Sequence, residues 1–146
     1  MSKATLDSEK NKLKPDYEWS GRPVTAKDYE NHINGKISIG IQPCRLDGTA
    51  QFGCIDIDPK NYKDFKTEKY LALFQQYKLP IVPLLSKSGG LHCYLFLEEP
   101  IPTTDLIEAL KSFLLPLGLK PTTEIFPKQK ELKKDDKGNV KPGNFI

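Results

Sequence analysis

Two aspartates lie one residue apart inside an apolar run. The stretch CIDIDPKN, residues 54–61, carries Asp56 and Asp58 next to Ile55 and Ile57. Alternate residues of a strand share a face, so the two carboxylates are about 6.5–7 Å apart on one side. Carboxylates held that close repel each other unless a cation lies between them. With no histidine or cysteine ligand beside them, such oxygen atoms favour Mg²⁺ or Mn²⁺. The alternative is a solvated strand end followed by a turn.

A Gly-Gly turn precedes a second candidate strand. In SKSGGLHCYLFL, residues 86–97, His92 shares a face with two aromatic residues, opposite to leucines and a cysteine. Gly89 and Gly90 would let the backbone approach a bound group and would offer amide N–H donors to phosphate. Hydroxyl and cationic side chains surround this turn, namely Ser86, Lys87, Ser88 and His92. The alternative is an ordinary hairpin with a histidine near its start.

A third acidic residue lies between apolar neighbours further along the chain. In TTEIFPKQ, residues 122–129, Glu124 and Phe126 face one way and Ile125 faces the other. An edge strand could carry such a glutamate without any function. Considered together, however, acid, acid, histidine and acid on one sheet face form the set of groups needed for metal-assisted phosphoryl chemistry.

These residues must be positioned by an α/β arrangement. The patterns predict helices near 25–34, 66–79 and 104–118, and strands over 36–43, 51–58, 81–86, 91–97 and 122–127, with another strand beginning at 144–146. The first two strands would form a hairpin around an Asp47-Gly48 turn. The order is typical of a mixed sheet with helices on one face, which leaves the other face for chemistry.

Composition restricts the class of protein. The chain has 146 residues, 38% hydrophobic and 28% charged, which predicts one soluble globular domain. The net charge of +3 only permits an anionic partner. No apolar run approaches the roughly 20 residues of a membrane span, so no membrane association is expected. The cysteines, Cys44, Cys54 and Cys93, are read as reduced thiols, and the cytoplasm is the expected location.

Three motifs, GCIDID, SKSGGLHCYLF and EIFPKQ…GNFI, resemble in order and spacing those of the archaeo-eukaryotic primase superfamily. The likeness covers about residues 40–146 and is greatest to primase-polymerases of phages, plasmids and mobile elements. The family's acidic pair, its serine-histidine motif and its single acid fall on Asp56 and Asp58, on Ser88 and His92, and on Glu124. The resemblance implies an RRM-like sheet packed against an N-terminal α/β unit, with the active site in the cleft between them.

The resemblance also implies an activity, namely a template-directed nucleotidyltransferase that makes or extends primers from nucleoside triphosphates. Its partners would be a single-stranded DNA template, the nucleotides, and a helicase domain or protein. Asp56, Asp58 and Glu124 would hold two Mg²⁺ or Mn²⁺ ions. Triphosphate contacts would come from Ser88, Gly89, Gly90 and His92, with Lys87, Lys128 and Arg45 as weaker candidates. Four further lysines could follow a template backbone or simply be solvated, namely Lys120, Lys130, Lys133 and Lys134.

Two other classes of function remain open from the sequence. One is a non-catalytic nucleic-acid-binding replication module, and the other is a metal-dependent nuclease. The expected organisation is a polar lead-in over residues 1–22 and a catalytic domain over residues 23–146. The chain ends directly after GNFI, where relatives usually continue, so we expect either a trimmed catalytic fragment or a natural minimal form.

Overall fold

The computed structural model describes residues 5–7, 12–14 and 18–146. The chain divides into two compact units, Met1–Gly40 and Ile41–Ile146. The first unit contains two short antiparallel strands and a helix, which are β1 (Thr5–Asp7), β2 (Lys12–Lys14) and α1 (Ala26–Ile33). The strand pair lies in the segment for which the sequence predicts only a polar lead-in.

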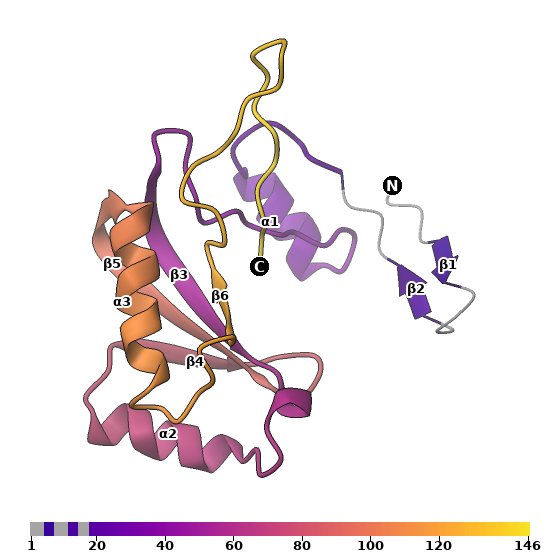
Figure 1. Cartoon of the computed structure of the whole chain (residues 1–146). Coiled ribbons are helices and arrows are strands. Elements are labelled where there is room, and N and C mark those ends of the chain that lie inside the picture. Colours follow the sequence, from indigo (N-terminus) through magenta and orange to yellow (C-terminus); the bar gives the residue numbers. More distant parts are fainter. Residues whose placement is uncertain (1–4, 8–11, 15–17) are drawn as a thin grey trace. The chain divides into compact units, whose positions relative to one another are not determined.

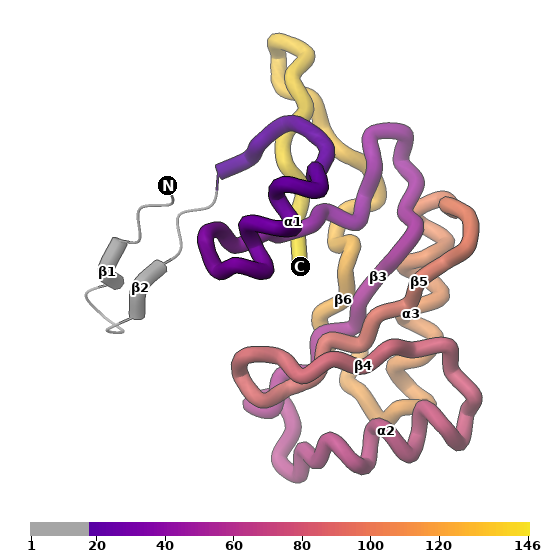
Figure 2. Tube along the Cα trace, turned by 180° about the vertical axis from the view of Figure 1, so that it is seen from behind, coloured from indigo at the N-terminus to yellow at the C-terminus, as the bar shows by residue number. Residues whose placement is uncertain are grey.

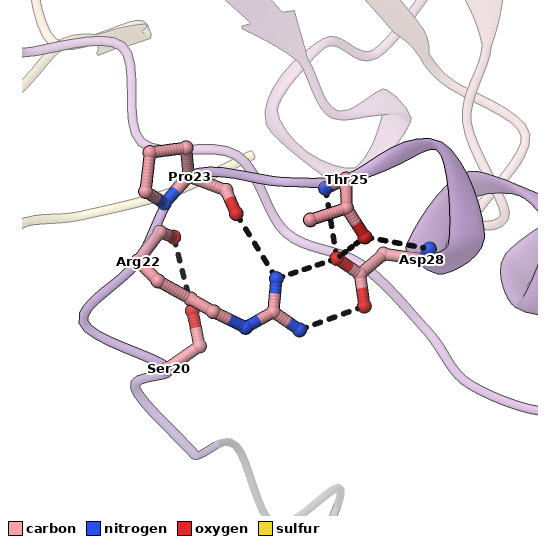
Figure 3. Close-up of polar contacts among 5 residues, drawn as sticks. All are labelled: Ser20, Arg22, Pro23, Thr25 and Asp28. Carbon is pink, nitrogen blue, oxygen red and sulfur yellow. Dashed lines mark hydrogen bonds and ion pairs between the residues drawn. The ribbon is translucent and has the colours of Figure 1, made fainter.

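Helix α1 begins at a capping box, at the position where the sequence predicts a helix to start. Thr25 is the N-cap: its side chain accepts from the backbone N–H of Asp28 at 3.3 Å, and its own N–H donates to Asp28 Oδ2 at 2.8 Å. The Arg22 guanidinium donates to both carboxylate oxygens of Asp28, at 2.6 and 2.9 Å (Figure 3). These bonds from Arg22 and Thr25 hold the pKa of Asp28 well below its usual value.

A four-stranded antiparallel sheet forms the second unit (Figure 1). Its strands are β3 (Thr49–Ile57), β4 (Ile81–Leu85), β5 (Leu91–Pro102) and β6 (Glu124–Phe126), in the spatial order β4-β5-β3-β6. The predicted α/β architecture is confirmed, but the sheet is not mixed. Strand β5 inserts between β3 and β4, so the two strands that a helical crossover joins are not neighbours, and every pairing is antiparallel.

Both helices of this unit cover one face of the sheet (Figure 1). Figure 2 shows the sheet from the opposite side. They are α2 (Thr67–Gln76) and α3 (Thr103–Leu114). Their buried residues share one core with alternate residues of β3 and β5, namely Tyr70, Phe74, Leu106, Leu110, Leu114, Ile55, Ile57, Leu91, Cys93 and Leu95. Leu91, Cys93 and Leu95 are buried as the alternation in the sequence predicts. Within the part of the chain that the structure describes, no helix is long and apolar enough to span a bilayer.

Glycine at position 53 allows α3 to approach the sheet. A Cβ atom there would lie 2.7 Å from Leu110 Cδ1 and 2.8 Å from the carbonyl oxygen of Phe126. Such contacts are closer than van der Waals packing permits, so a side chain on Gly53 would push α3 and β6 away from β3. The glycine in GCIDID therefore belongs to the packing of the helix layer.

The strand predicted over residues 36–43 is absent, and so is the hairpin. Ile37 and Ile41 are 41% and 36% exposed, so their alternation does not mark a buried face. Ile41 instead exchanges two backbone hydrogen bonds with Ile146, at 3.2 and 3.3 Å. Residues 144–146, the other predicted strand, are likewise irregular. The Asp47-Gly48 turn does form, but β3 then pairs with β5 and β6.

Candidate functional site

One row across the open sheet face carries two of the predicted acids and the predicted histidine. In the strand register, Asp56 of β3 lies opposite His92 of β5 on one side and opposite Glu124 of β6 on the other. Directly opposed residues point to the same face, with Cβ atoms about 4.5–5.5 Å apart. The sheet order thus places Asp56 between a histidine and a second acid, although the three come from distant parts of the sequence.

Burial and neighbouring charges act together on Asp56. Its side chain is 25% exposed, and Oδ1 lies 3.8 Å from Nε2 of His92. Burial raises the pKa of the Asp56 carboxyl above its ordinary value, and the nearby carboxylates of Glu124 and Asp58 raise this pKa further. His92 and Lys128 act in the opposite direction. A cation brought to this row would counteract these effects and favour the ionised form of Asp56.

The other two acids already have partners. Asp58 directly follows β3 and caps a 3₁₀ turn, η1 (Pro59–Asn61). Its Oδ1 accepts from the backbone N–H of Lys60 at 3.0 Å, and Lys60 Nζ lies 3.7 Å from its Oδ2. Glu124 accepts a hydrogen bond from the ammonium group of Lys128. That ammonium group also lies 4.9 Å from the centre of the Phe126 ring. Lys128 therefore places a cation on the acidic row.

The residues fit a divalent cation in donor type and charge. Carboxylate oxygens are the ligands that Mg²⁺ and Mn²⁺ prefer, and the ion pair to Lys128 shows that the row accepts a positive charge. Among the described residues, however, no group of three or more acidic, histidine or cysteine side chains is arranged to hold a metal ion. Asp56 and Glu124 share the face, whereas Asp58 caps η1 at the strand end.

The Gly-Gly turn lies against the end of β3. Gly89 donates its N–H to the Ser86 carbonyl and Gly90 donates to Ser86 Oγ, both at 3.0 Å, while Ser86 Oγ lies 3.0 Å from Ser88 Oγ. Both amides that the sequence predicts to contact phosphate are thus used within the turn. A Cβ on Gly90 would lie 2.3 Å from the Ile57 carbonyl oxygen, so glycine lets the turn reach the strand end that carries the acids.

Comparison with protein families matches residues 2–141 to the archaeo-eukaryotic primase domain of TOTE conflict systems. The chain belongs to the archaeo-eukaryotic primase superfamily. The resemblance that the three sequence motifs indicate is therefore confirmed at this level. Archaeo-eukaryotic primase domains are in general primase-polymerase-like nucleotidyltransferases. A search of curated proteins found no match.

The primase domain does not bring Arg45 to the acids. Arg45 precedes β3, and its backbone N–H donates to the Thr49 carbonyl at 2.8 Å. At about 3.3 Å per residue, the strand separates Thr49 from Asp56 by roughly 20 Å. Arg45 thus lies at the other end of β3. Lys87 and Ser88, in contrast, belong to the turn that touches the acidic end.

Aromatic rings continue the open face of the primase domain beyond His92. The ring centroids of Phe52 and Phe96 are 6.1 Å apart, those of Tyr94 and Phe96 5.7 Å, and those of His92 and Tyr94 6.2 Å. Phe96 is 59% exposed. The sequence places Tyr94 and Phe96 on this face, but Phe52 is not among its candidates. The two-residue period that links Phe52 to Asp56 is the signal that identifies it.

Cys54 and Cys93 of the primase domain are unsuited to chemistry. Cys44, Cys54 and Cys93 are free and buried. Burial raises the pKa of the Cys93 thiol to about 12 and raises that of Cys54 as well. Thiols at such pKa values are not ionised near neutral pH, and the thiolate is the form that attacks or binds metal. The oxygen and imidazole groups are therefore the reactive groups of this face.

Proposed function

We propose that this primase domain is a template-directed nucleotidyltransferase that makes or extends primers from nucleoside triphosphates. The observation that carries the proposal is the position of Asp56 between His92 and Glu124 on an open sheet face. A module that only binds nucleic acid gains nothing from carboxylates that face a polyanion. A nucleotidyltransferase needs such carboxylates, because they hold the cations that neutralise the triphosphate.

Asp56, Asp58 and Glu124 would hold two Mg²⁺ or Mn²⁺ ions. When bound, these ions would activate the primer 3′-hydroxyl and neutralise the triphosphate. Asp56 is the central ligand, because its partly buried carboxylate has neighbouring negative charges on two sides. Glu124 must break its ion pair with Lys128 before it can bind a metal ion. The released ammonium group of Lys128 then becomes a donor to the triphosphate, which is the contact that we assign to it.

The nucleotide would be held by residues on either side of the acids. His92 donates to the triphosphate, and Ser88 and Lys87 contact it from the turn. Gly89 and Gly90 shape that turn and support its position against β3. The aromatic rings beside His92 offer a stacking surface to a base, and stacking of this kind contributes about 1–3 kcal/mol per base.

The experiment is a product assay with a labelled primer on a single-stranded template, Mn²⁺ and nucleotides. Longer products support the proposal, shorter products indicate a nuclease, and a mobility shift without new products indicates a binding module. The combined substitution Asp56→Asn with Asp58→Asn should abolish the longer products. The matched control is Glu98→Gln with Glu99→Gln, which removes two charges from β5 away from the acidic row and should leave synthesis unchanged.

A further inference from the structure

A basic cavity lies beside η1, which directly follows β3. All of its lining residues belong to the second unit. Its volume is about 600 Å³, and its walls come from η1, the loop that follows it, the start of α2 and the segment before β6. The lining includes four lysines and two tyrosines, namely Lys60, Lys63, Lys69, Lys120, Tyr62 and Tyr70. Asp64 is the one acidic residue of the lining. The walls therefore carry a net positive charge.

Two of these cations, Lys69 and Lys120, are held in place without a carboxylate partner. Lys120 donates from Nζ to the Asn61 carbonyl at 2.7 Å and lies 5.5 Å from the centre of the Tyr62 ring. Lys69 Nζ lies 5.6 Å from the centre of the Tyr70 ring. Lys63, Lys69 and Lys120 have no ion pair to any residue that the structure describes. Such uncompensated, positioned cations form a site for an anion.

An ion pair joins the cavity to the acidic end of the sheet. Lys60 lines the cavity and its Nζ lies 3.7 Å from Oδ2 of Asp58. On the other side, the Tyr62 hydroxyl lies 2.5 Å from Oγ1 of Thr123, the residue before Glu124. Through Lys60, the cavity and the carboxylate of Asp58 share one rim. A polyanion that ends at the carboxylates can continue into the cavity.

We propose that this cavity binds backbone phosphates of a single nucleic-acid strand whose end lies at the acidic row. The assignment rests on the proposed function, because that function brings a strand end to the carboxylates. The chemistry matches a strand better than a free anion: ammonium groups contact phosphates, while the Tyr62 and Tyr70 rings present apolar surface to sugars and bases. Lys60, at the rim, lies between the strand's last phosphate and Asp58.

The test is a binding measurement without metal ions or nucleotides. A fluorescent oligodeoxythymidylate is titrated by anisotropy, in EDTA and over a series of NaCl concentrations. The variant is Lys63→Gln with Lys69→Gln and Lys120→Gln. The control removes the same charge elsewhere on the surface, through Lys78→Gln with Lys111→Gln and Lys137→Gln. Thermal unfolding checks that both are folded. Lys63→Gln alone is the second variant, because the Lys63 side chain has no hydrogen bond or ion pair to the described residues.

The slope of log K against log salt is about −0.7 per phosphate contact for single strands. The triple variant should therefore lose up to about 2 from this slope and bind at least roughly tenfold more weakly, while the control keeps the wild-type slope. Lys63→Gln should remove up to about 0.7. An unchanged slope in the triple variant, or an equal loss in the control, would overturn the proposal.

Two further arms identify the source of the phosphate and separate this proposal from the enzymatic one. Inorganic tripolyphosphate is titrated as a competitor. If it displaces the oligonucleotide from the wild type at equal concentrations of phosphate groups, the cavity binds free polyphosphate and the strand assignment is wrong.

The same titrations in the Asp56→Asn, Asp58→Asn background need no catalysis. A cavity that binds in this background is confirmed even if synthesis is never observed.

Discussion

Asp56 carries a carboxylate that is only 25% exposed and that has further acids beside it. A partly buried charge of this kind costs stability unless a cation compensates it. Lys128, which lowers the pKa of Asp56, supplies part of that compensation while its ammonium group is paired with Glu124. The row is therefore unfavourable for stability without bound cations and becomes favourable when they bind, which is what a cation-binding function requires.

Replacing Asp56 by asparagine should stabilise the metal-free protein at neutral pH. The folded-state pKa of Asp56 lies above its ordinary value of 3.8, so the native state binds more protons than the unfolded state between the two pKa values. Stability from this group is thus present at low pH and is lost as the pH rises through the folded-state pKa. Asparagine removes that loss. Tm in EDTA should rise, by about 2–4 °C for each kcal/mol gained.

The contrasting variant is Asp47→Asn. Hydrogen bonds from the Thr49 hydroxyl and backbone N–H lower the pKa of Asp47, so this substitution should lower Tm at neutral pH. Thermal unfolding of both variants is compared across a pH series. A fall in Tm for Asp56→Asn at neutral pH would mean that the carboxylate is compensated within the protein.

His92→Ala should separate nucleotide binding from metal binding. The proposal assigns His92 to the triphosphate and not to the ions. Loss of a charge-assisted hydrogen bond costs about 1.5–3 kcal/mol, so nucleotide affinity should fall roughly ten- to a hundred-fold while Mn²⁺ affinity stays nearly unchanged. Mn²⁺ and nucleotide are each titrated against the variant. If its Mn²⁺ affinity falls as far as that of the double aspartate variant, His92 is a metal ligand.

Among the elements, those with a buried apolar face could be predicted from the sequence. The alternation in β5 and the helical spacing of Tyr70 with Phe74 both indicate which side is buried. The same alternation in residues 36–43 was misleading, because spacing alone does not show whether a partner covers the isoleucines. Nor does spacing reveal the order β4-β5-β3-β6. Long-range pairing alone places His92 and Glu124 beside Asp56 and leaves Arg45 at the far end of β3.

The turn between β4 and β5 should depend on Gly90 for steric reasons. Alanine at this position would put a Cβ 2.3 Å from the Ile57 carbonyl oxygen and 2.8 Å from Pro59 Cδ. Overpacking of this kind costs about 1–3 kcal/mol, and it would push the turn away from the acids. We expect Gly90→Ala to lower Tm and to weaken nucleotide binding together. Lys87→Ala, on the exposed part of the same turn, should leave Tm unchanged. An unaltered Tm for Gly90→Ala would show that the turn can move without cost.

Metal binding should raise the thermal stability of the whole molecule. A ligand that binds only the native state stabilises it by about 2.7 kcal/mol at a hundred times its Kd. Mn²⁺ should therefore raise the Tm of the wild type and of the Glu98→Gln, Glu99→Gln control. The Asp56→Asn, Asp58→Asn variant should show little change. An equal rise in all three proteins would place the ions elsewhere, and the carboxylates would then be a solvated strand end.

A primer-extension assay with single nucleotides tests directly whether synthesis is directed by the template. A labelled primer is annealed to templates that differ only in the single-stranded base next to the primer end, and each is incubated with Mn²⁺ and one nucleotide at a time. We expect each template to support addition of its complementary nucleotide alone, and the Asp56→Asn, Asp58→Asn variant to add none. Equal addition of any nucleotide on every template, or addition that survives the double substitution, would contradict it.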